Sequence, residues 1–359
     1  MRVAVAMSGG VDSSTAAGLL KEQGHDVIGV TLKTHVSVGN SARVCCSSDV
    51  LGDALRVAET LQIPFHVINC QDVFHRDVVL PFAEAYRDGR TPNPCIDCND
   101  QIKFGLLWER ARALGVERLA TGHYARIDRT AGAPRLRRGQ DRAKDQSYFL
   151  YRVANRLGHL EFPVGDMTKT EVRGHARRLG LAVFDKPASQ EICFVGADGY
   201  AALVEQLLDL DSRFGNIVDG NGRVLGHHAG VHHFTLGQRH GLGVAAAEPL
   251  YVTGIDPARA EVRVGGREDL LVEQVEVERV VWSEGPSAVG TLVEVQQRYR
   301  DRPKLARLTA CDGSRVALRF VEPTLRAAPG QAAVFYVGDL VLGGGTVVSS
   351  TPVTEVEVA

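Results

Sequence analysis

Two hydrophobic periodicities alternate over the first two hundred positions of the chain. Short, largely apolar runs, which are typical of buried strands, occur at 3–6, 27–32 and 65–68, and a fourth strand is expected at 118–121. Segments with apolar residues at helical spacing lie between them, at 13–23, 48–61 and 104–114. Strands that alternate with helices form a parallel sheet with helices on both faces. The pattern therefore predicts a doubly wound α/β domain, which we place at residues 1–205.

The pattern changes after about residue 205. Glycine-rich turns lie at 219–222, 241–243, 265–266 and 343–345, and they separate short runs of alternating apolar and polar residues. Such alternation is typical of strands with one buried face, and closely spaced turns favour antiparallel pairing. We expect a small linking domain at residues 206–269 and a C-terminal β-barrel at residues 270–359.

The composition excludes several classes of protein. The chain has 359 residues, 44% of them hydrophobic and 23% charged, and a formal net charge of −2. These values argue against disordered, collagen-like and coiled-coil chains. No apolar run approaches the ~20 residues of a membrane span, and the strand-like start has no signal-peptide pattern. We therefore expect a cytoplasmic protein that does not bind a membrane.

Residues 8–14, Ser-Gly-Gly-Val-Asp-Ser-Ser, join the first predicted strand to the first predicted helix. Glycines let backbone N–H groups approach an anion, and the helix N-terminus adds partial positive charge. The segment lacks the lysine of a Walker P-loop, which argues against transfer of a γ-phosphate. Asp12 is unexpected in a phosphate-binding loop unless it holds Mg²⁺ or positions a nucleotide. The alternative is a purely structural strand-to-helix turn.

Seven cysteines are an odd number for a disulfide framework, so reactive thiols or metal ligands are the better hypothesis. Cys95 and Cys98 form a CxxC pair after Thr91-Pro92-Asn93-Pro94, where the prolines predict a stiff, extended loop. The pair fits half a zinc site, a redox pair or two unrelated thiols, and no second CxxC completes a zinc site. Cys193 is a third candidate. The other four have no predicted chemistry: Cys45, Cys46, Cys70 and Cys311.

Basic residues gather in three segments although the net charge is near zero: 126–142, 173–178 and 298–307. One such segment is typical of a solvated face, but three indicate segregated positive charge suited to phosphates. Four histidines lie within residues 226–233. The Gly-Gln-Arg turn that follows favours a strand and turn there rather than a metal site.

Several further short segments form recognisable motifs along the chain: 91–99, 120–124, 144–150, 162–165, 192–194, 235–239, 298–300 and 329–331. Together with residues 8–14 they resemble bacterial tRNA-specific 2-thiouridylases, members of the ATP pyrophosphatase superfamily that place sulfur at C2 of the wobble uridine. The resemblance runs from residue 2 to about residue 349. Its most specific part is Thr-Pro-Asn-Pro combined with Lys-Asp-Gln-Ser-Tyr-Phe and Gly-Gln-Arg.

The resemblance implies an enzyme that adenylates the C2 oxygen, releases pyrophosphate and AMP, and transfers sulfur from a persulfide. It implies Cys98 as the catalytic thiol and Cys193 as the persulfide carrier, joined by a disulfide after turnover. ATP, accompanied by Mg²⁺, would be bound by Ala6, Met7, Ser8, Gly9, Gly10, Val11, Asp12, Ser13, Leu32 and Gly122. The target base and tRNA would be contacted by Asn93, Pro94, Cys95, His123, Lys144, Asp145, Gln146, Arg298, Tyr299 and Gln331.

The implied partners are tRNAs of the Lys, Glu and Gln type and a persulfide sulfur donor protein or relay. Cys95 departs from the best-known members of the family, in which an aspartate lies three residues before the first thiol. Related thiolases with three cysteines hold a [4Fe–4S] cluster, so one alternative is that Cys95, Cys98 and Cys193 are iron ligands. Another is that Cys95 is only a passive, neutral substitute for the aspartate. A small-molecule ATP pyrophosphatase synthetase is disfavoured, because a small substrate needs neither the β domain nor the arginine segments.

Overall fold

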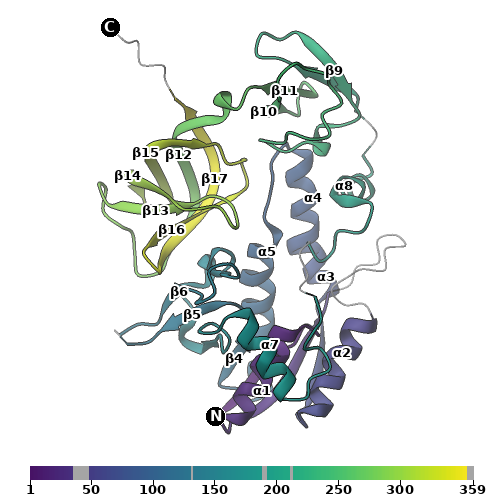
Figure 1. The fold of residues 1–359 in the computed structure, drawn as a ribbon, viewed down its shortest axis with the longest axis vertical. Helices are drawn as coiled ribbons and strands as arrows, with labels where there is room; N and C mark the ends of the chain where they lie inside the picture. Colours follow the sequence, from purple (N-terminus) through teal and green to yellow (C-terminus); the bar gives the residue numbers. More distant parts are fainter. Residues whose placement is uncertain (35–47, 131, 188–191, 211–212, 354–359) are drawn as a thin grey trace. The chain divides into compact units, whose positions relative to one another are not determined.

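The computed structural model describes residues 1–34, 48–130, 132–187, 192–210 and 213–353, so Cys45 and Cys46 lie outside the described residues. The chain divides into two compact units (Figure 1). Unit 1 comprises Met1–Val79, Pro94–Ala197 and Asp339–Val341, and unit 2 comprises Leu80–Asn93, Asp198–Gly338 and Leu342–Ala359. In the described ranges, no helix combines the length and the apolar character that crossing a membrane requires.

Unit 1 is built on a five-stranded parallel sheet with the strand order β3-β2-β1-β4-β7. Its strands are β1 (Arg2–Ala6), β2 (Asp26–Lys33), β3 (Phe65–Asn69), β4 (Arg118–Thr121) and β7 (Leu160–Glu161). Val3 and Val5 share a core with three helices, α1 (Val11–Glu22), α2 (Ser48–Thr60) and α7 (Lys169–Arg178). Ala4, whose side chain points to the other face, is also fully buried. Burial on both faces confirms the doubly wound parallel sheet.

A second helical segment of unit 1 differs from the sequence prediction, which had an extended loop followed by a helix over 104–114. Its parts are α3 (Gln71–Phe74), η1 (His75–Val79), α5 (Pro94–Asp97), η2 (Cys98–Leu106) and α6 (Leu107–Arg112). Helical structure already begins at Pro94, because proline fits the first helical position, where its missing N–H would be unpaired anyway. The extended stretch therefore stops at Asn93, and Cys95 and Cys98 lie on helical turns.

The rest of unit 1 consists of short elements that the hydrophobic pattern did not predict. They are the hairpin β5 (Ala125–Asp128) and β6 (Arg135–Arg138) and the 3₁₀ turns η3 (Ser147–Phe149), η4 (Tyr151–Val153) and η5 (Leu157–His159). Three of the four residues of β6 are arginines, so the strand carries almost no apolar signal. The sequence consequently indicated a basic segment here and missed the hairpin.

Unit 2 contains a four-stranded sheet of order β10-β11-β8-β9 and two helices, α4 (Leu80–Arg87) and α8 (Gly199–Leu208). The strands are β8 (Gly215–Val218), β9 (Val224–His228), β10 (Tyr251–Asp256) and β11 (Glu261–Gly265). Only the pair β11 and β8 is parallel among these strands. The turn η6 (Val231–His233) follows β9, so the histidine-rich segment forms the predicted strand and turn.

A closed six-stranded barrel forms the remainder of this half of the chain. The order β12-β15-β14-β13-β16-β17 is closed by pairing of β12 with β17. The elements are η7 (Glu268–Leu270), β12 (Leu271–Trp282), β13 (Leu292–Gln296), β14 (Lys304–Asp312), β15 (Arg315–Leu325), β16 (Ala332–Val337) and β17 (Leu340–Pro352). Val275, Leu318 and Phe335 are among the fully buried residues of its interior, and Cys311 packs against them from β14. The predicted β-barrel is confirmed.

Candidate active site

The predicted nucleotide-binding residues meet at one edge of the parallel sheet. β1 is flanked by β2 on one side and β4 on the other, and Ala6 pairs in register with both. In such sheets, ligands bind at the carboxyl ends of the strands where the strand order reverses. Ser8–Gly10 lead from β1 into α1, Leu32 lies near the end of β2, and Gly122 follows β4. The structure thus brings together three segments that are far apart in the sequence.

Two glycines in this region occupy positions that no larger residue fits. Gly9 has φ +63°, and a Cβ there would lie 2.4 Å from the carbonyl oxygen of Val50. A Cβ on Gly122 would lie 2.4 Å from the backbone nitrogen of Ser13. Because the obstructing atoms belong to the backbone, they cannot rotate away. Gly122 therefore determines how closely β4 approaches the first turn of α1.

The first turn of α1 is arranged to receive a ligand. Among the described residues, no side chain caps the helix at Gly10, so its first N–H groups remain available to an anion. The hydroxyl of Ser14 is buried and donates to the carbonyl of Gly10 at 2.8 Å, while Ser8 is exposed at the loop surface. Ser13 Oγ accepts from the Ser8 N–H at 3.1 Å. Ser14 thus shapes the loop, and Ser8 lies where a phosphate would bind.

Asp12 is engaged by two neighbours that the sequence did not point to. Lys169 Nζ lies 2.6 and 2.8 Å from its two carboxylate oxygens, and the Tyr124 hydroxyl donates to one of them at 2.7 Å. Burial, followed by the charge of Asp12, raises the pKa of Tyr124, so the phenol stays protonated. A Mg²⁺ ion would have to displace the lysine from both oxygens. The donor set at Asp12 therefore does not fit Mg²⁺ in this arrangement.

A second lysine contacts the glycine loop itself. Lys186 Nζ donates to the carbonyl of Gly9 at 3.1 Å and lies 2.5 Å from a carboxylate oxygen of Asp53. Burial raises the pKa of Asp53, but bonding to Lys186 and Arg56 outweighs it, and the net pKa is lowered. The carboxylate is consequently ionised and holds the ammonium group beside the loop. Lys169 and Lys186 thus both lie beside the glycine loop and the first turn of α1, and each is paired with a carboxylate.

The three candidate thiols also belong to unit 1. Cys95 is exposed, whereas Cys98 and Cys193 are half-buried. Cys95 and Cys98 are three residues apart on helical turns, so their side chains leave the same face. Asp97, between them, forms an ion pair with Arg152. Within the described residues the three sulfurs are not gathered within 4.8 Å of one another, so they do not form a mononuclear metal site.

His123 lies against aromatic rings and a lysine. Its ring centroid is 5.7 Å from that of Phe104 and 6.1 Å from that of Phe162, and Nδ1 is 2.7 Å from Thr121 Oγ1. Burial, and then the positive charge of Lys103, hold the pKa of His123 well below its usual range. The imidazole is neutral at pH 7. It therefore offers a ligand a hydrogen bond rather than a positive charge.

This neutral imidazole predicts a stability that falls on acidification. The unfolded chain has the ordinary histidine pKa of about 6.5, so below that pH it takes up a proton that the folded state does not. The free energy of unfolding is expected to decrease by up to about 1.4 kcal/mol per pH unit from this site. Urea unfolding of wild type and His123→Gln from about pH 8 to about pH 5 measures the effect. Equal slopes in the two proteins would contradict it.

The predicted tRNA contacts at 144–146 have structural partners. The buried carboxylate of Asp145 accepts from the Gly139 N–H at 2.9 Å and from the Ser147 hydroxyl at 2.9 Å, and it pairs with Arg138 at 3.2 Å. Gln146 Oε1 accepts a hydrogen bond from the backbone N–H of Tyr124 at 2.9 Å. Both side chains therefore hold the turn that carries Lys144.

Ion pairs neutralise most of the first basic segment. Arg126 and Arg142 both pair with Asp339, Arg137 pairs with Asp128, and Arg129 pairs with Glu161. The third segment differs, because in the described part of the chain Arg300, Arg302 and Lys304 form no ion pair. Positive charge available to phosphates is thus concentrated on the barrel rather than on the hairpin.

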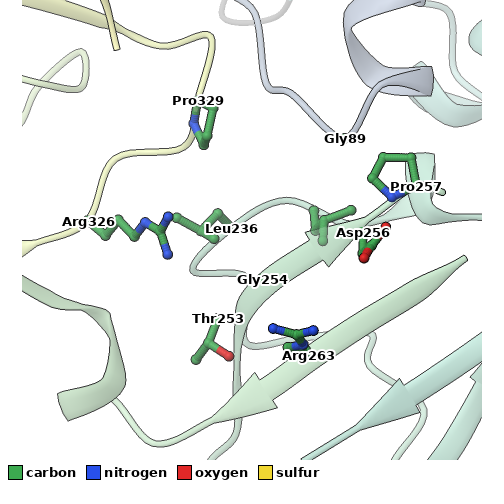
Figure 2. A pocket seen from close by; sticks show the side chains of 10 residues that line it. Gly89, Leu236, Thr253, Gly254, Asp256, Pro257, Arg263, Arg326 and Pro329 are labelled. Carbon is green, nitrogen blue, oxygen red and sulfur yellow. The ribbon is translucent and has the colours of Figure 1, made fainter. Parts of the chain in front are cut away.

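The remaining predicted RNA contacts belong to unit 2, and one of them bonds to the backbone of a residue that lines a pocket there. Arg298 Nη2 donates to the carbonyl of Arg326 at 2.9 Å, and Gln331 Nε2 donates to the carbonyl of Thr91 at 2.9 Å. Tyr299 is half-buried, with the Arg300 guanidinium 5.3 Å from its ring centroid. The pocket has a volume of about 390 Å³ and is lined by Gly89, Leu236, Thr253, Gly254, Ile255, Asp256, Pro257, Arg263, Arg326 and Pro329 (Figure 2). Arg326 Nε is buried there without a hydrogen-bond partner among the described residues.

Comparison with known proteins now identifies the family. Family models match residues 1–197 (tRNA methyl transferase HUP domain), 206–266 (tRNA methyl transferase PRC-barrel domain) and 272–347 (aminomethyltransferase beta-barrel domain). The tRNA-specific 2-thiouridylase MnmA of Geobacter metallireducens is 47% identical over 96% of this chain and 96% of its own length. The chain belongs to the tRNA-specific 2-thiouridylase family. The resemblance found in the sequence is confirmed.

A second curated relative matches the chain equally well, whereas the solved structures match it only weakly. The enzyme of Moorella thermoacetica is 46% identical over 96% of this chain and 99% of its own length. Among solved structures, a 4-thiouridine synthetase in complex with RNA and ATP aligns with 15% identity and a TM-score of 0.36, covering 58% of this chain and 50% of that one. No conclusion about the fold follows from so low a score.

In this member of the family, the sequence pointed to the glycine loop and the thiols but not to the lysines beside that loop. Lys169 lies 157 positions from Asp12, and Lys186 lies 177 positions from Gly9. Neither lysine belongs to a motif, so no local signal marked it. Cys70, for which the sequence assigned no chemistry, is buried and donates from its thiol to the carbonyl of Lys33 at 3.4 Å.

Proposed function

We propose that this chain is a tRNA-uridine 2-sulfurtransferase, which uses ATP to replace the C2 oxygen of the wobble uridine with sulfur. The observation that carries the proposal is the uncapped N-terminus of α1 after Ser8–Gly10, in the same unit as Cys98 and Cys193. An anion-binding loop without a P-loop lysine favours adenylation, and thiols supply sulfur chemistry. The proposed substrates are tRNAs of the Lys, Glu and Gln type, with a persulfide protein as sulfur donor.

In the first half-reaction, the C2 oxygen of uridine attacks the α-phosphate of ATP and pyrophosphate leaves. A carbonyl oxygen is a poor leaving group until it is adenylated. The first N–H groups of α1, the Ser8 hydroxyl and Lys186 would stabilise the charge on the departing pyrophosphate. Since Asp12 does not fit a metal ion, we propose that it positions Lys169 beside the nucleotide. Mg²⁺ would enter with ATP.

In the second half-reaction, the Cys98 thiolate attacks the inner sulfur of the Cys193 persulfide. The S–S bond of the persulfide breaks, hydrosulfide is released, and a Cys98–Cys193 disulfide forms. Hydrosulfide then adds to C2, and AMP leaves with the original oxygen. An external thiol reductant must restore both cysteines. Alternatively, the terminal persulfide sulfur attacks C2 directly.

An iron–sulfur route uses the same residues differently. Cys95, Cys98 and Cys193 would hold three irons of a [4Fe–4S] cluster, which would supply an iron able to bind sulfide. Thiols are the donors that such a cluster takes, so the residues fit it chemically. Anaerobic purification followed by iron and sulfide analysis distinguishes the routes. About four irons per chain, lost in Cys95→Ser, would support the cluster. An iron-free wild-type protein, purified anaerobically, would rule out the iron–sulfur route.

The activity is tested by incubating the protein with ATP, a persulfide donor and unmodified tRNA. The expected products are 2-thiouridine at the wobble position, AMP and pyrophosphate in equal amounts. Mass spectrometry of digested tRNA measures 2-thiouridine, and chromatography measures AMP and pyrophosphate. Rapid ATP–pyrophosphate exchange without any tRNA would instead favour a synthetase that acts on a small molecule.

We further propose that the three predicted parts divide this work. Residues 1–205 would bind ATP and carry the thiols, residues 206–269 would link, and residues 270–359 would hold tRNA. The unpaired positive charge of Arg302 and Lys304 on the barrel side supports the last assignment. The basic segment at 126–142 is a poorer candidate for tRNA binding, because Asp339 neutralises two of its arginines.

Charge removal on the barrel is therefore expected to weaken tRNA binding. Arg302→Gln should reduce the slope of log K against log salt by about 1, as expected when one phosphate contact is lost. Arg142→Gln is the matched control, since its guanidinium is paired with Asp339 and should change the slope little. Fluorescence titrations at several salt concentrations give both slopes. A larger effect of Arg142→Gln than of Arg302→Gln would contradict the assignment.

A further inference from the structure

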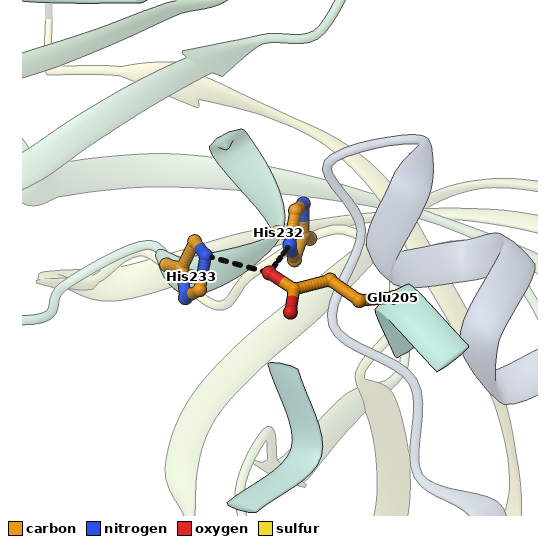
Figure 3. A group of neighbouring side chains, drawn as sticks. All are labelled: Glu205, His232 and His233. Carbon is orange, nitrogen blue, oxygen red and sulfur yellow. Dashed lines mark hydrogen bonds and ion pairs between the residues drawn. The ribbon is translucent and has the colours of Figure 1, made fainter. Parts of the chain in front are cut away.

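Three side chains of types that bind metals converge in unit 2, whereas the glycine loop and the thiols belong to unit 1. Glu205 comes from α8, and His232 and His233 come from η6 (Figure 3). Both histidines point their Nε2 atoms at the same carboxylate oxygen, at 2.9 Å for His232 and 3.1 Å for His233. All three donor atoms lie within 4.8 Å of one another. The sequence had favoured a strand and turn over a metal site here, and the strand and turn do form.

The spacing of the donor atoms suits a small divalent ion. Zinc bonds of 2.0–2.2 Å in tetrahedral geometry place neighbouring ligand atoms about 3.3 Å apart. The two Oε1–Nε2 distances would need to open by only a few tenths of an ångström. Glu205 has a half-exposed carboxylate on a flexible side chain, so it can move without disturbing the helix.

Burial and backbone contacts hold the imidazoles in place without an ion. His232 is 5% exposed, and its ring lies 4.4 Å from that of His233. The Tyr200 hydroxyl, from the same helix as Glu205, donates to the backbone carbonyl of His233 at 3.2 Å. The two ligand-bearing elements are thus fixed to each other through the backbone. His233 and Glu205 remain open enough to solvent for an ion to enter.

We propose that Glu205, His232 and His233 form a binding site for one divalent transition-metal ion of the zinc class, with water completing the coordination. Two imidazoles and one carboxylate are a donor set that Zn²⁺ accepts. Each Nε2 that donates to the carboxylate would present its lone pair to the ion in its other tautomer. The ion would link α8 to the turn that precedes Thr235 and so stabilise the linking part of the chain.

The test measures Zn²⁺ binding to the full chain by equilibrium dialysis and its effect on thermal unfolding. Glu205→Gln and His233→Ala are the informative variants, because both side chains are half-exposed and their replacement spares the core. Each is expected to lose one equivalent of Zn²⁺, or to bind it at least about 10-fold more weakly. Each should also lose the rise in Tm that Zn²⁺ gives the wild type. His227→Ala, at an exposed histidine on β9, is the matched control and should retain both.

The thiols are a second place where Zn²⁺ can bind, so Cys98→Ser is included. That variant should keep the equivalent that Glu205→Gln and His233→Ala lose. Unchanged stoichiometry and affinity in both of those variants would overturn the proposal and leave the cluster as an ion pair only. Equal losses in His227→Ala would overturn it as well, because they would indicate adventitious surface binding.

Discussion

Replacement of Cys193 by alanine is expected to abolish formation of 2-thiouridine while ATP still binds. The proposed persulfide resides on Cys193, so alanine leaves no atom to hold the sulfur. Loss of a group that forms a covalent intermediate costs at least about 10³-fold in rate. Mass spectrometry of digested tRNA measures the product, and equilibrium binding of ATP is measured beside it. The glycine loop is expected to bind ATP as in the wild type.

A second cysteine of similar exposure controls for nonspecific damage. Cys311 is half-buried like Cys193 but packs against the barrel interior, so Cys311→Ala should retain sulfur transfer. Cys98→Ser should behave like Cys193→Ala, because serine cannot attack the persulfide. If either Cys98→Ser or Cys193→Ala thiolated tRNA at the wild-type rate, the assigned roles of the two thiols would be wrong.

Gly122→Ala is expected to lower ATP-dependent activity at least about 100-fold, the scale of a misplacement near 1 Å in an active site. The added Cβ would lie 2.4 Å from the Ser13 nitrogen and 2.6 Å from the Asp12 carbonyl carbon. Since both are backbone atoms, the first turn of α1 must shift and its N–H groups leave their positions around pyrophosphate. The measurement is the rate of AMP release in the presence of tRNA, together with the KM for ATP.

Gly174→Ala serves as the matched control for this substitution. Gly174 lies within α7, and a Cβ there would meet nothing within 4 Å. Alanine is favoured over glycine in a helix, so the variant should be active and at least as stable as the wild type. Activity of Gly122→Ala equal to that of Gly174→Ala would show that the close approach of β4 to α1 is not needed.

Local features of the sequence were sufficient for much of the fold. Strands β1 and β2 are largely apolar because parallel strands are buried on both faces. The candidate pyrophosphate loop was recognisable because its glycines are adjacent in sequence and its conformation is local. The start of α5 was mispredicted, since proline ends a helix in one position and begins one in another.

Charge could not be read from the sequence in the same way. The arginines of 126–142 form a basic segment on paper, but Arg126 and Arg142 share Asp339, which lies 213 and 197 positions away. His232 and His233 gain a carboxylate from Glu205 on α8, 27 or more positions away in the sequence. A run of like charges looks the same in a sequence whether or not a distant residue neutralises it.

By itself, then, the sequence determined the family and the main strands and helices of the parallel sheet, and it predicted an anion-binding loop and reactive thiols. These depend on periodicity and on motifs of adjacent residues. Only the tertiary structure decided that Lys169 pairs with Asp12, that Lys186 bonds to the glycine loop, and which basic residues are not neutralised by an ion pair. Ion pairs act over a few ångströms in space, and chain folding alone decides which residues come within that range.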